Sequence, residues 1–362
     1  METAQKKRIG ILTGGGDCPG LNAVIRAACL TCISHDYELV GLHDGFEGLY
    51  EEAYTILDSH KVANIYGEGG TILGTTNIGH YCLPLSEDTI KRTVETYNKL
   101  GLQCLICIGG DGTMSIAYVL SQHGVNVVGV PKTIDNDLMA TDVTFGFDSA
   151  VSVVTDALDR LQTTAASHHR VMVVEVMGRN AGWIALASGV AGGANVILLP
   201  EIRWEWESIF ATLKARAADK GKRYSLVVVA EGCVPPGSDS QITADDEAKK
   251  AVRLGGIGKY VSDRIAKDIG MDTRYVILGH VQRGGSPTSY DRILATKYGS
   301  MAAKLAIEGT YGYMASLKGT EVVKVPITAE MREQRKVNPK TDQMVWAARN
   351  VGTVFGDEHH SS

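Results

Sequence analysis

The sequence predicts an α/β protein whose sheets are mostly parallel. Aliphatic runs recur along the chain, and most are solidly apolar rather than alternating, as in strands covered on both faces. Segments with helical periodicity separate several of these runs, which is typical of parallel sheets. The length of 362 residues exceeds one average domain, and we therefore expect two.

The strands follow from the apolar runs, taken in chain order. We predict eight strands, in "RIGILTG" (8–14), "ELVGLHDG" (38–45), "CLICIGG" (104–110), "VVGVPKT" (127–133), "RVMVVEVMG" (170–178), "ANVILLPE" (194–201), "SLVVVAEG" (225–232) and "RYVILGHVQRGG" (274–285). Helical periodicity predicts helices in "NAVIRAACLTCI" (22–33) and "SEDTIKRTVETYNKL" (86–100).

Composition excludes several classes of partner. The formal charge of -5 gives no basic field for nucleic acid or an anionic membrane. No apolar run approaches the roughly 20 residues that span a bilayer. The N-terminus lacks the apolar stretch of a signal peptide, so we expect a cytoplasmic protein. The seven cysteines are expected to be packed free thiols, because Cys104 and Cys107 face opposite sides of a strand and cannot easily share a metal.

Polar residues gather where the predicted strands end. Glycines and charged side chains follow most of the aliphatic runs, namely Gly16-Asp17, Gly110-Asp111, Asp135, Arg179, Glu231, and His280 with Arg283. In open α/β sheets, ligands bind beyond the carboxyl ends of the strands, where helix N-termini also begin. The distribution therefore predicts an active site at this edge.

Two glycine-rich turns join a strand to a helix. Gly14, Gly15 and Gly16 allow a ligand to approach the backbone closely. This stretch matches no standard dinucleotide or P-loop signature, so the alternative that it is only a tight turn remains. "CIGGDGTMS" repeats the design with Asp111 between glycines and Thr113 at the start of the next helix. A carboxylate beside a phosphate cradle suits Mg²⁺. Together the two turns favour binding of nucleotide phosphates.

"KTIDND" places two carboxylates, an amide and a cation directly after an apolar strand. Either Asp135 or Asp137 can take a proton from a substrate hydroxyl while the other helps to hold metal. A solvated loop or helix cap would explain either carboxylate alone but not the cluster.

Four arginines at predicted strand ends suit a sugar phosphate, although each alone could be a surface ion pair: Arg170, Arg179, Arg274 and Arg283.

Six motifs occur in the order "TGGGDCPGLNAVIR", "GGDGT", "TIDND", "EVMGRNAGW", "AEG" and "LGHVQRGG". In this order they resemble the phosphofructokinase family over most of the chain. The resemblance implies Mg²⁺-dependent phosphorylation of the 1-hydroxyl of fructose 6-phosphate in glycolysis, with ATP or pyrophosphate as donor. It also implies a homodimer or homotetramer whose sites are shared between subunits.

The resemblance further implies two similar three-layer α/β/α lobes with the active site in the cleft between them. The larger, nucleotide-binding lobe would comprise residues 1–146 with 282–332. The smaller, sugar-phosphate-binding lobe would comprise residues 147–281 with 333–350, and residues 351–362 would form a C-terminal tail.

Residue roles follow from the same resemblance. Asp135 would be the general base, in a loop completed by Lys132, Thr133, Ile134 and Asp137. Asp111 would hold Mg²⁺, and the donor would lie against Gly15, Gly16, Gly110, Gly112 and Thr113. The sugar would be held by Met177, Gly178, Arg179 and Glu231, and its 6-phosphate by the stretch His280, Val281, Gln282 and Arg283. Arg170 and Arg274 would come from a neighbouring subunit.

The phosphoryl donor depends on two positions. The resemblance implies that pyrophosphate users of the family carry an Asp at the position of Gly112, where its bulk and charge obstruct a nucleotide. The glycine of this chain leaves room for ATP. Lys132, in contrast, stands where pyrophosphate users also carry Lys and many bacterial ATP enzymes carry Gly. We expect ATP and keep pyrophosphate as the second donor.

Two further classes of protein share part of this pattern. NAD kinases and lipid kinases also carry "GGDGT", although they lack "TIDND" followed by "MGRNAGW". A catalytically weak regulatory homologue is the second class, because relatives carry an Arg where this chain has Asn77 and Ile78. Lys132 would then supply the missing positive charge, or activity would be lower.

Overall fold

A computed structural model describes residues 6–76, 79–219, 221, 223–238, 241 and 255–358. The chain divides into two compact units: unit 1 is Met1–Ser149 with Arg283–Gln334, and unit 2 is Ala150–Gln282 with Arg335–Ser362. Each unit is built on one sheet, and both sheets are mainly parallel, so the predicted α/β class is confirmed. No helix among the described residues is long and apolar enough to cross a bilayer.

Unit 1 contains a seven-stranded sheet with the order β11-β10-β5-β4-β1-β2-β3. Its strands are β1 Lys7–Thr13, β2 Tyr37–Leu42, β3 Tyr54–Leu57, β4 Leu102–Gly109, β5 Val127–Pro131, β10 Tyr313–Lys318 and β11 Glu321–Pro326. The five central strands run parallel, and the two edge strands, β3 and β11, are antiparallel to their neighbours. β4 is buried along almost its whole length, which explains its solid run of aliphatic residues.

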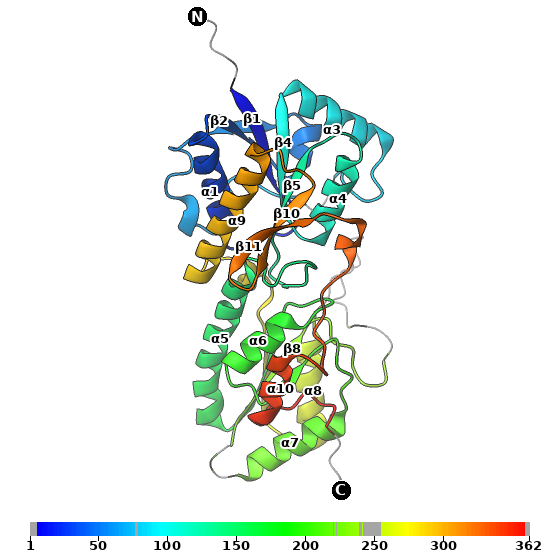
Figure 1. Ribbon diagram of the computed structural model, residues 1–362. Coiled ribbons are helices and arrows are strands. Elements are labelled where there is room, and N and C mark those ends of the chain that lie inside the picture. Colours follow the sequence, from blue (N-terminus) through cyan, green and yellow to red (C-terminus); the bar gives the residue numbers. More distant parts are fainter. Residues whose placement is uncertain are drawn as a thin grey trace, which may run out of the picture. The chain divides into compact units, whose positions relative to one another are not determined.

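The helices of unit 1 cover the sheet (Figure 1), and α1 packs closely along α9. They are α1 Leu21–Ile33, α2 Glu47–Tyr50, α3 Glu87–Lys99, α4 Asp111–Ser121 and α9 Ser289–Ile307, with short 3₁₀ turns at η1 Ile65–Gly67 and η3 Ala329–Arg332. Ser86 caps the start of α3, because its side chain accepts a hydrogen bond from the Thr89 N–H.

Unit 2 contains a four-stranded, fully parallel sheet with the order β7-β8-β6-β9. Its strands are β6 Val171–Val176, β7 Val196–Leu198, β8 Ser225–Ala230 and β9 Thr273–Ile277. Its helices are α5 Phe147–His168, which begins in unit 1, α6 Trp183–Ala191, α7 Trp206–Ala218, α8 Ile257–Ile269 and α10 Gln343–Asn350, and η2 Gly279–Arg283 follows β9.

All eight predicted strands and both predicted helices are present, whereas β3, β10 and β11 were not predicted. β11 has a mostly exposed pattern and includes charged residues, so it lacks the apolar signal of a covered strand. β10 pairs with it antiparallel and with β5 parallel. Both strands are therefore identified by their pairing in the sheet and not by a pattern in the sequence.

Residues 351–362 were expected to form a C-terminal tail, but residues 353–358 pack on the rest of unit 2. Val354 pairs with the backbone of Asn195 and Ile197, and the Phe355 ring is fully buried. Arg349 donates to Glu358 at 2.5 Å and to Asp357 at 2.8 Å. Burial of one aromatic side chain and paired charges hold this segment to the unit. Residues 359–362 lie outside the described part.

Candidate active site

Three loops of unit 1 meet at the carboxyl ends of β1, β4 and β5, because these strands are neighbours in the sheet. Backbone hydrogen bonds continue the ladder beyond the strands, from Gly14 N to Ile108 O at 2.8 Å and from Lys132 N to Gly109 O at 2.9 Å. The two glycine-rich turns and the "KTIDND" loop are therefore brought together. These loops lie at one edge of the unit 1 sheet, where the sequence predicts the active site.

The loop from Lys132 to Asp137 is held by Asn136, a residue without a role in the sequence-based assignment. Asn136 adopts φ 52° and is buried, and its Oδ1 accepts hydrogen bonds from Thr144 N at 3.0 Å and Thr144 Oγ1 at 3.4 Å. Thr144 Oγ1 also donates to Thr133 O at 2.7 Å. Asn is among the few residues that tolerate a left-handed backbone, and that preference was the available signal.

The carboxylates of this loop have perturbed acidities. Burial raises the pKa of Asp135, although the charges of Arg283 and Lys132 act to lower it. Burial, together with the charges of Asp135 and Asp111, raises the pKa of Asp137 to about 7. Raised carboxylate pKa values are typical of groups that exchange protons near neutral pH. Ile134, between these residues in the chain, is fully buried, so only its backbone can meet a ligand.

Two cations lie among these loops. The Lys132 side chain is 4% exposed and donates a hydrogen bond to the carbonyl oxygen of Gly16, and burial lowers its pKa. Arg283 donates to Asp17 O at 3.2 Å. A Cβ atom at Gly16 would lie 2.8 Å from Arg283 Nη1, so any larger residue would displace the guanidinium. Arg283 thus lies with the first glycine-rich turn, whereas the resemblance assigned it to a phosphate of the sugar.

Asp111 begins α4, and its carboxylate oxygens accept hydrogen bonds from Gly112 N at 2.8 Å and Gln334 Nε2 at 3.5 Å. Its charge acts on both Asp135 and Asp137. These three carboxylates are not close enough to surround one ion by themselves, since among the described residues only another cluster meets that criterion. One carboxylate completed by phosphate oxygens and water is the donor set that Mg²⁺ commonly takes, and Asp111 fits it.

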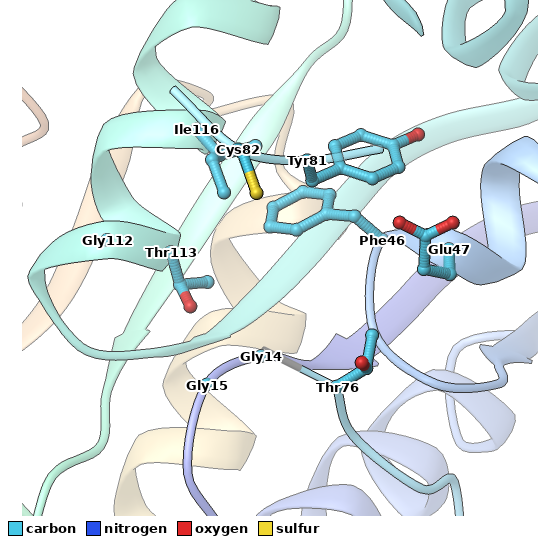
Figure 2. A pocket seen from close by; sticks show the side chains of 10 residues that line it. All are labelled: Gly14, Gly15, Phe46, Glu47, Thr76, Tyr81, Cys82, Gly112, Thr113 and Ile116. Carbon is cyan, nitrogen blue, oxygen red and sulfur yellow. The ribbon is translucent and has the colours of Figure 1, made fainter. Parts of the chain in front are cut away.

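A cavity of about 160 Å³ lies beside the glycine-rich turns. Its lining residues are Gly14, Gly15, Phe46, Glu47, Thr76, Tyr81, Cys82, Gly112, Thr113 and Ile116. Figure 2 shows the Phe46 and Tyr81 rings on one side, with Gly112 and Thr113 of α4 and the Gly14–Gly15 turn around the rest. The two rings stack with centroids 5.1 Å apart. An aromatic wall next to backbone N–H groups suits a planar base joined to phosphates.

In unit 2, the predicted sugar-binding residues follow β6, β8 and β9. Glu231 N donates to Val176 O at 2.8 Å, and Gly232 N donates to Gly178 O at 3.1 Å. Arg179 is exposed and lines a cavity of about 570 Å³ that Lys336 also lines. The carboxyl ends of these strands thus present a guanidinium and a carboxylate, which suit phosphate and hydroxyl groups respectively.

Gln282 is fully buried, and its side chain bonds protein rather than solvent. Its Oε1 accepts from Met177 N at 3.2 Å, and its Nε2 donates to Gly279 O at 3.0 Å. The side chain therefore joins the segments after β6 and β9. His280 and Val281 next to it are exposed.

Arg170 and Arg274 lie at the amino ends of β6 and β9, not at the carboxyl ends where the other predicted sugar-binding residues lie. Both pair with Asp272, through contacts of 2.5 Å each. Six residues of β6 follow Arg170, which corresponds to roughly 20 Å at the rise of a strand, and three residues of β9 follow Arg274, which corresponds to roughly 10 Å. The sequence could not distinguish the two ends, because both are simply the limits of an apolar run.

The cysteines and one acidic cluster are the remaining metal-ligand candidates. All seven cysteines are free and all but Cys82 are buried, as packed thiols should be. Within the described residues, one set of three ligand atoms lies within 4.8 Å of one another, from Glu47, Glu51 and His80. In that set Glu47 already accepts two hydrogen bonds from His80. Asn77 and Ile78 lie outside the described residues.

Comparisons with known proteins agree with this geometry. A family model described as Phosphofructokinase matches residues 8–306. An ATP-dependent 6-phosphofructokinase of Chloroflexus aggregans is 50% identical over 361 residues, which cover 98% of this chain and 99% of that protein. A pyrophosphate–fructose 6-phosphate 1-phosphotransferase of Amycolatopsis mediterranei is 47% identical over 333 residues, which cover 91% of this chain and 96% of that protein.

Solved structures give the same picture. The phosphofructokinase of Pichia pastoris in the T-state has a TM-score of 0.79 at 30% identity over 97% of this chain. The match covers only 37% of that much longer chain. A pyrophosphate-dependent phosphofructokinase of Nitrosospira multiformis has a TM-score of 0.80 at 19% identity, over 98% of this chain and 94% of that one, and supports the fold alone.

Proposed function

The chain belongs to the phosphofructokinase family, and from this premise we propose that it transfers a phosphoryl group from ATP to the 1-hydroxyl of fructose 6-phosphate. The observation that carries the proposal is the partly buried carboxylate of Asp135, with its raised pKa, beside two glycine-rich turns and two cations. Membership of this family sets aside the NAD-kinase and lipid-kinase functions.

The proposed chemistry follows from the loop geometry. Asp135 takes the proton of the attacking hydroxyl, and Thr133 helps to hold it in place, since Asp135 N donates to Thr133 Oγ1 at 3.1 Å. Asp137 completes the loop. Asp111 would hold Mg²⁺, whose charge would neutralise the donor phosphates. Lys132 and the first turn of α4 add positive charge where the phosphoryl group passes.

For the acceptor, we propose that Arg179, Glu231 and the Gly178 backbone hold the sugar phosphate, with His280 at its 6-phosphate. The exposed guanidinium and the carboxylate after β6 and β8 support these roles. Arg170 and Arg274 would serve the site of a neighbouring subunit. Their position at the amino ends of β6 and β9, a strand length from Glu231, supports that division.

The cavity beside Gly112 supports ATP as the donor, because pyrophosphate has no part that needs the Phe46–Tyr81 wall. Pyrophosphate is the second candidate, supported by Lys132 and by relatives with that named donor at 47% identity. The test is a coupled assay with purified protein, fructose 6-phosphate, Mg²⁺ and either donor. Turnover with ATP alone supports the proposal, turnover with pyrophosphate alone replaces it by the second candidate, and turnover with neither supports a regulatory homologue.

The pH profile of kcat/KM is expected to fall on the acid side with an apparent pKa near 7. Asp135 and Asp137 lie close together and titrate as a pair, so the doubly ionised, active form is lost as pH falls through the raised pKa of Asp137. Asp137→Asn removes that step and one negative neighbour of Asp135, so the acid limb should move to lower pH. An acid limb that stays in place in the variant would contradict this coupling.

Sharing of sites between subunits predicts complementation. Asp135→Asn and Arg274→Ala should each be nearly inactive as pure proteins. In a mixture dissociated and reassembled at random, about half of the pairs should be hybrids, each with one doubly damaged and one intact site. Roughly a quarter of all sites should recover activity. No recovery is expected if Arg274 acts within its own chain, and that result would contradict the shared site.

A further inference from the structure

The donor cavity has two chemically distinct ends. The Gly14–Gly15 turn and the start of α4 at Gly112 and Thr113 offer backbone N–H groups, which suit phosphates. Phe46, Tyr81, Cys82 and Ile116 offer apolar surface, which suits the base of a nucleotide. Only a nucleotide donor would use the second end.

Tyr81 and Cys82 reach the cavity from a segment that belongs to no helix or strand, so other contacts must fix it. Tyr81 stacks on Phe46, and its hydroxyl lies 2.6 Å from Thr93 Oγ1. The residue before it, His80, is bound twice by one carboxylate: Glu47 Oε1 accepts from His80 N at 2.5 Å, and Glu47 Oε2 lies 2.8 Å from His80 Nδ1. The Glu47 side chain is only 15% exposed.

The surroundings are shaped around this pair. The His80 ring stacks on the Tyr50 ring with centroids 3.6 Å apart, and the Arg92 guanidinium lies 4.3 Å from the Tyr50 centroid. Gly79 has φ 123°, and a Cβ atom there would overlap Glu47 Oε1. A side chain at residue 79 would therefore push the carboxylate away from His80.

We propose that Glu47 and His80 form a clamp that holds Tyr81 and Cys82 in the nucleoside-binding wall of the donor cavity. The clamp residues are positioning residues, and through Tyr81 they determine how tightly the nucleoside part of the donor binds. The inference rests on the proposed use of ATP. The proposal assigns the clamp no role at the phosphate end, where the Gly14–Gly15 turn and the start of α4 lie.

The clamp is tested with Glu47→Ala, which removes both bonds to His80, and Glu47→Gln, whose amide can still accept from His80 N. Glu51→Ala is the matched control, because Glu51 is an exposed carboxylate one helical turn further on, whereas the bonds to His80 come from Glu47. Binding of ADP and of inorganic pyrophosphate to each protein is measured by calorimetry, and KM for ATP by the coupled assay.

Glu47→Ala is expected to weaken ADP binding and to raise KM for ATP by about tenfold, the effect of losing a charge-assisted hydrogen bond. Pyrophosphate affinity and kcat at saturating ATP should change far less, and Glu47→Gln should recover part of the loss. Unchanged ADP affinity would overturn the clamp. So would an equal loss for ADP and pyrophosphate, because that is the effect of general damage.

If Glu47→Ala does not fold, His80→Ala removes the same contacts from the other side and has the same expected result. The proposed donor is judged separately by the turnover of the unmodified protein. If that protein turns over pyrophosphate but not ATP, the donor proposal fails while ADP calorimetry still decides the clamp. Absence of measurable ADP binding to the unmodified protein would overturn the clamp as well.

Discussion

Asp135→Asn is expected to lower kcat by about 10²–10⁴-fold, because the amide keeps the shape of the carboxylate but cannot accept the proton of the attacking hydroxyl. KM for fructose 6-phosphate should change little, since the residues proposed to bind the sugar are untouched. Steady-state kinetics with saturating ATP and Mg²⁺ measure both quantities.

The control is Asp142→Asn, which neutralises the next carboxylate along the chain after Asp137. Asp142 is partly exposed and pairs with Lys318 at 3.2 Å, so its removal should leave kcat nearly unchanged. Thermal unfolding of both variants separates catalytic from structural effects. Near-normal turnover by Asp135→Asn would show that another group accepts the proton.

Gly112→Asp is expected to abolish most ATP-dependent activity. A Cβ atom at Gly112 meets no other atom within 4 Å, so the protein itself has room for the side chain. The carboxylate would enter the donor cavity, where a like charge at about 4 Å costs about 4 kcal/mol at an effective dielectric constant of 20. KM for ATP should therefore rise by about 10³-fold. The resemblance implies Asp at this position in the pyrophosphate users of the family, so we expect activity with pyrophosphate to gain relative to ATP.

Gly112→Asn separates charge from bulk, because it has nearly the same size and no charge. We expect it to lose much less ATP affinity than Gly112→Asp. Gln122→Glu adds a carboxylate at the exposed, opposite end of α4 and should leave ATP kinetics unchanged. Unaltered ATP kinetics in Gly112→Asp would place the nucleotide elsewhere.

Local pattern was enough for most of the fold. Strands covered on both faces leave continuous aliphatic runs, and for this reason "CLICIGG" and "SLVVVAEG" were recognisable as β4 and β8. The edge strand β11 left no such run, because one side of an edge strand faces solvent and carries charged residues. The glycine-rich turns and "KTIDND" were likewise recognisable, since unusual backbone and clustered charge are visible in the residues themselves.

The sequence by itself determined the α/β class, the order of eight of the strands along the chain and the carboxyl-end loops with their reactive side chains. Tertiary structure decided which loops are neighbours, because the order β5-β4-β1 depends on packing between distant segments. It placed Arg283 beside Gly16 and the Lys132 amine on the Gly16 carbonyl oxygen. It also put Arg170 and Arg274 at the amino ends of their strands and raised the pKa of Asp137 to about 7. Distance and burial set these properties, and both arise only when remote parts of the chain come together.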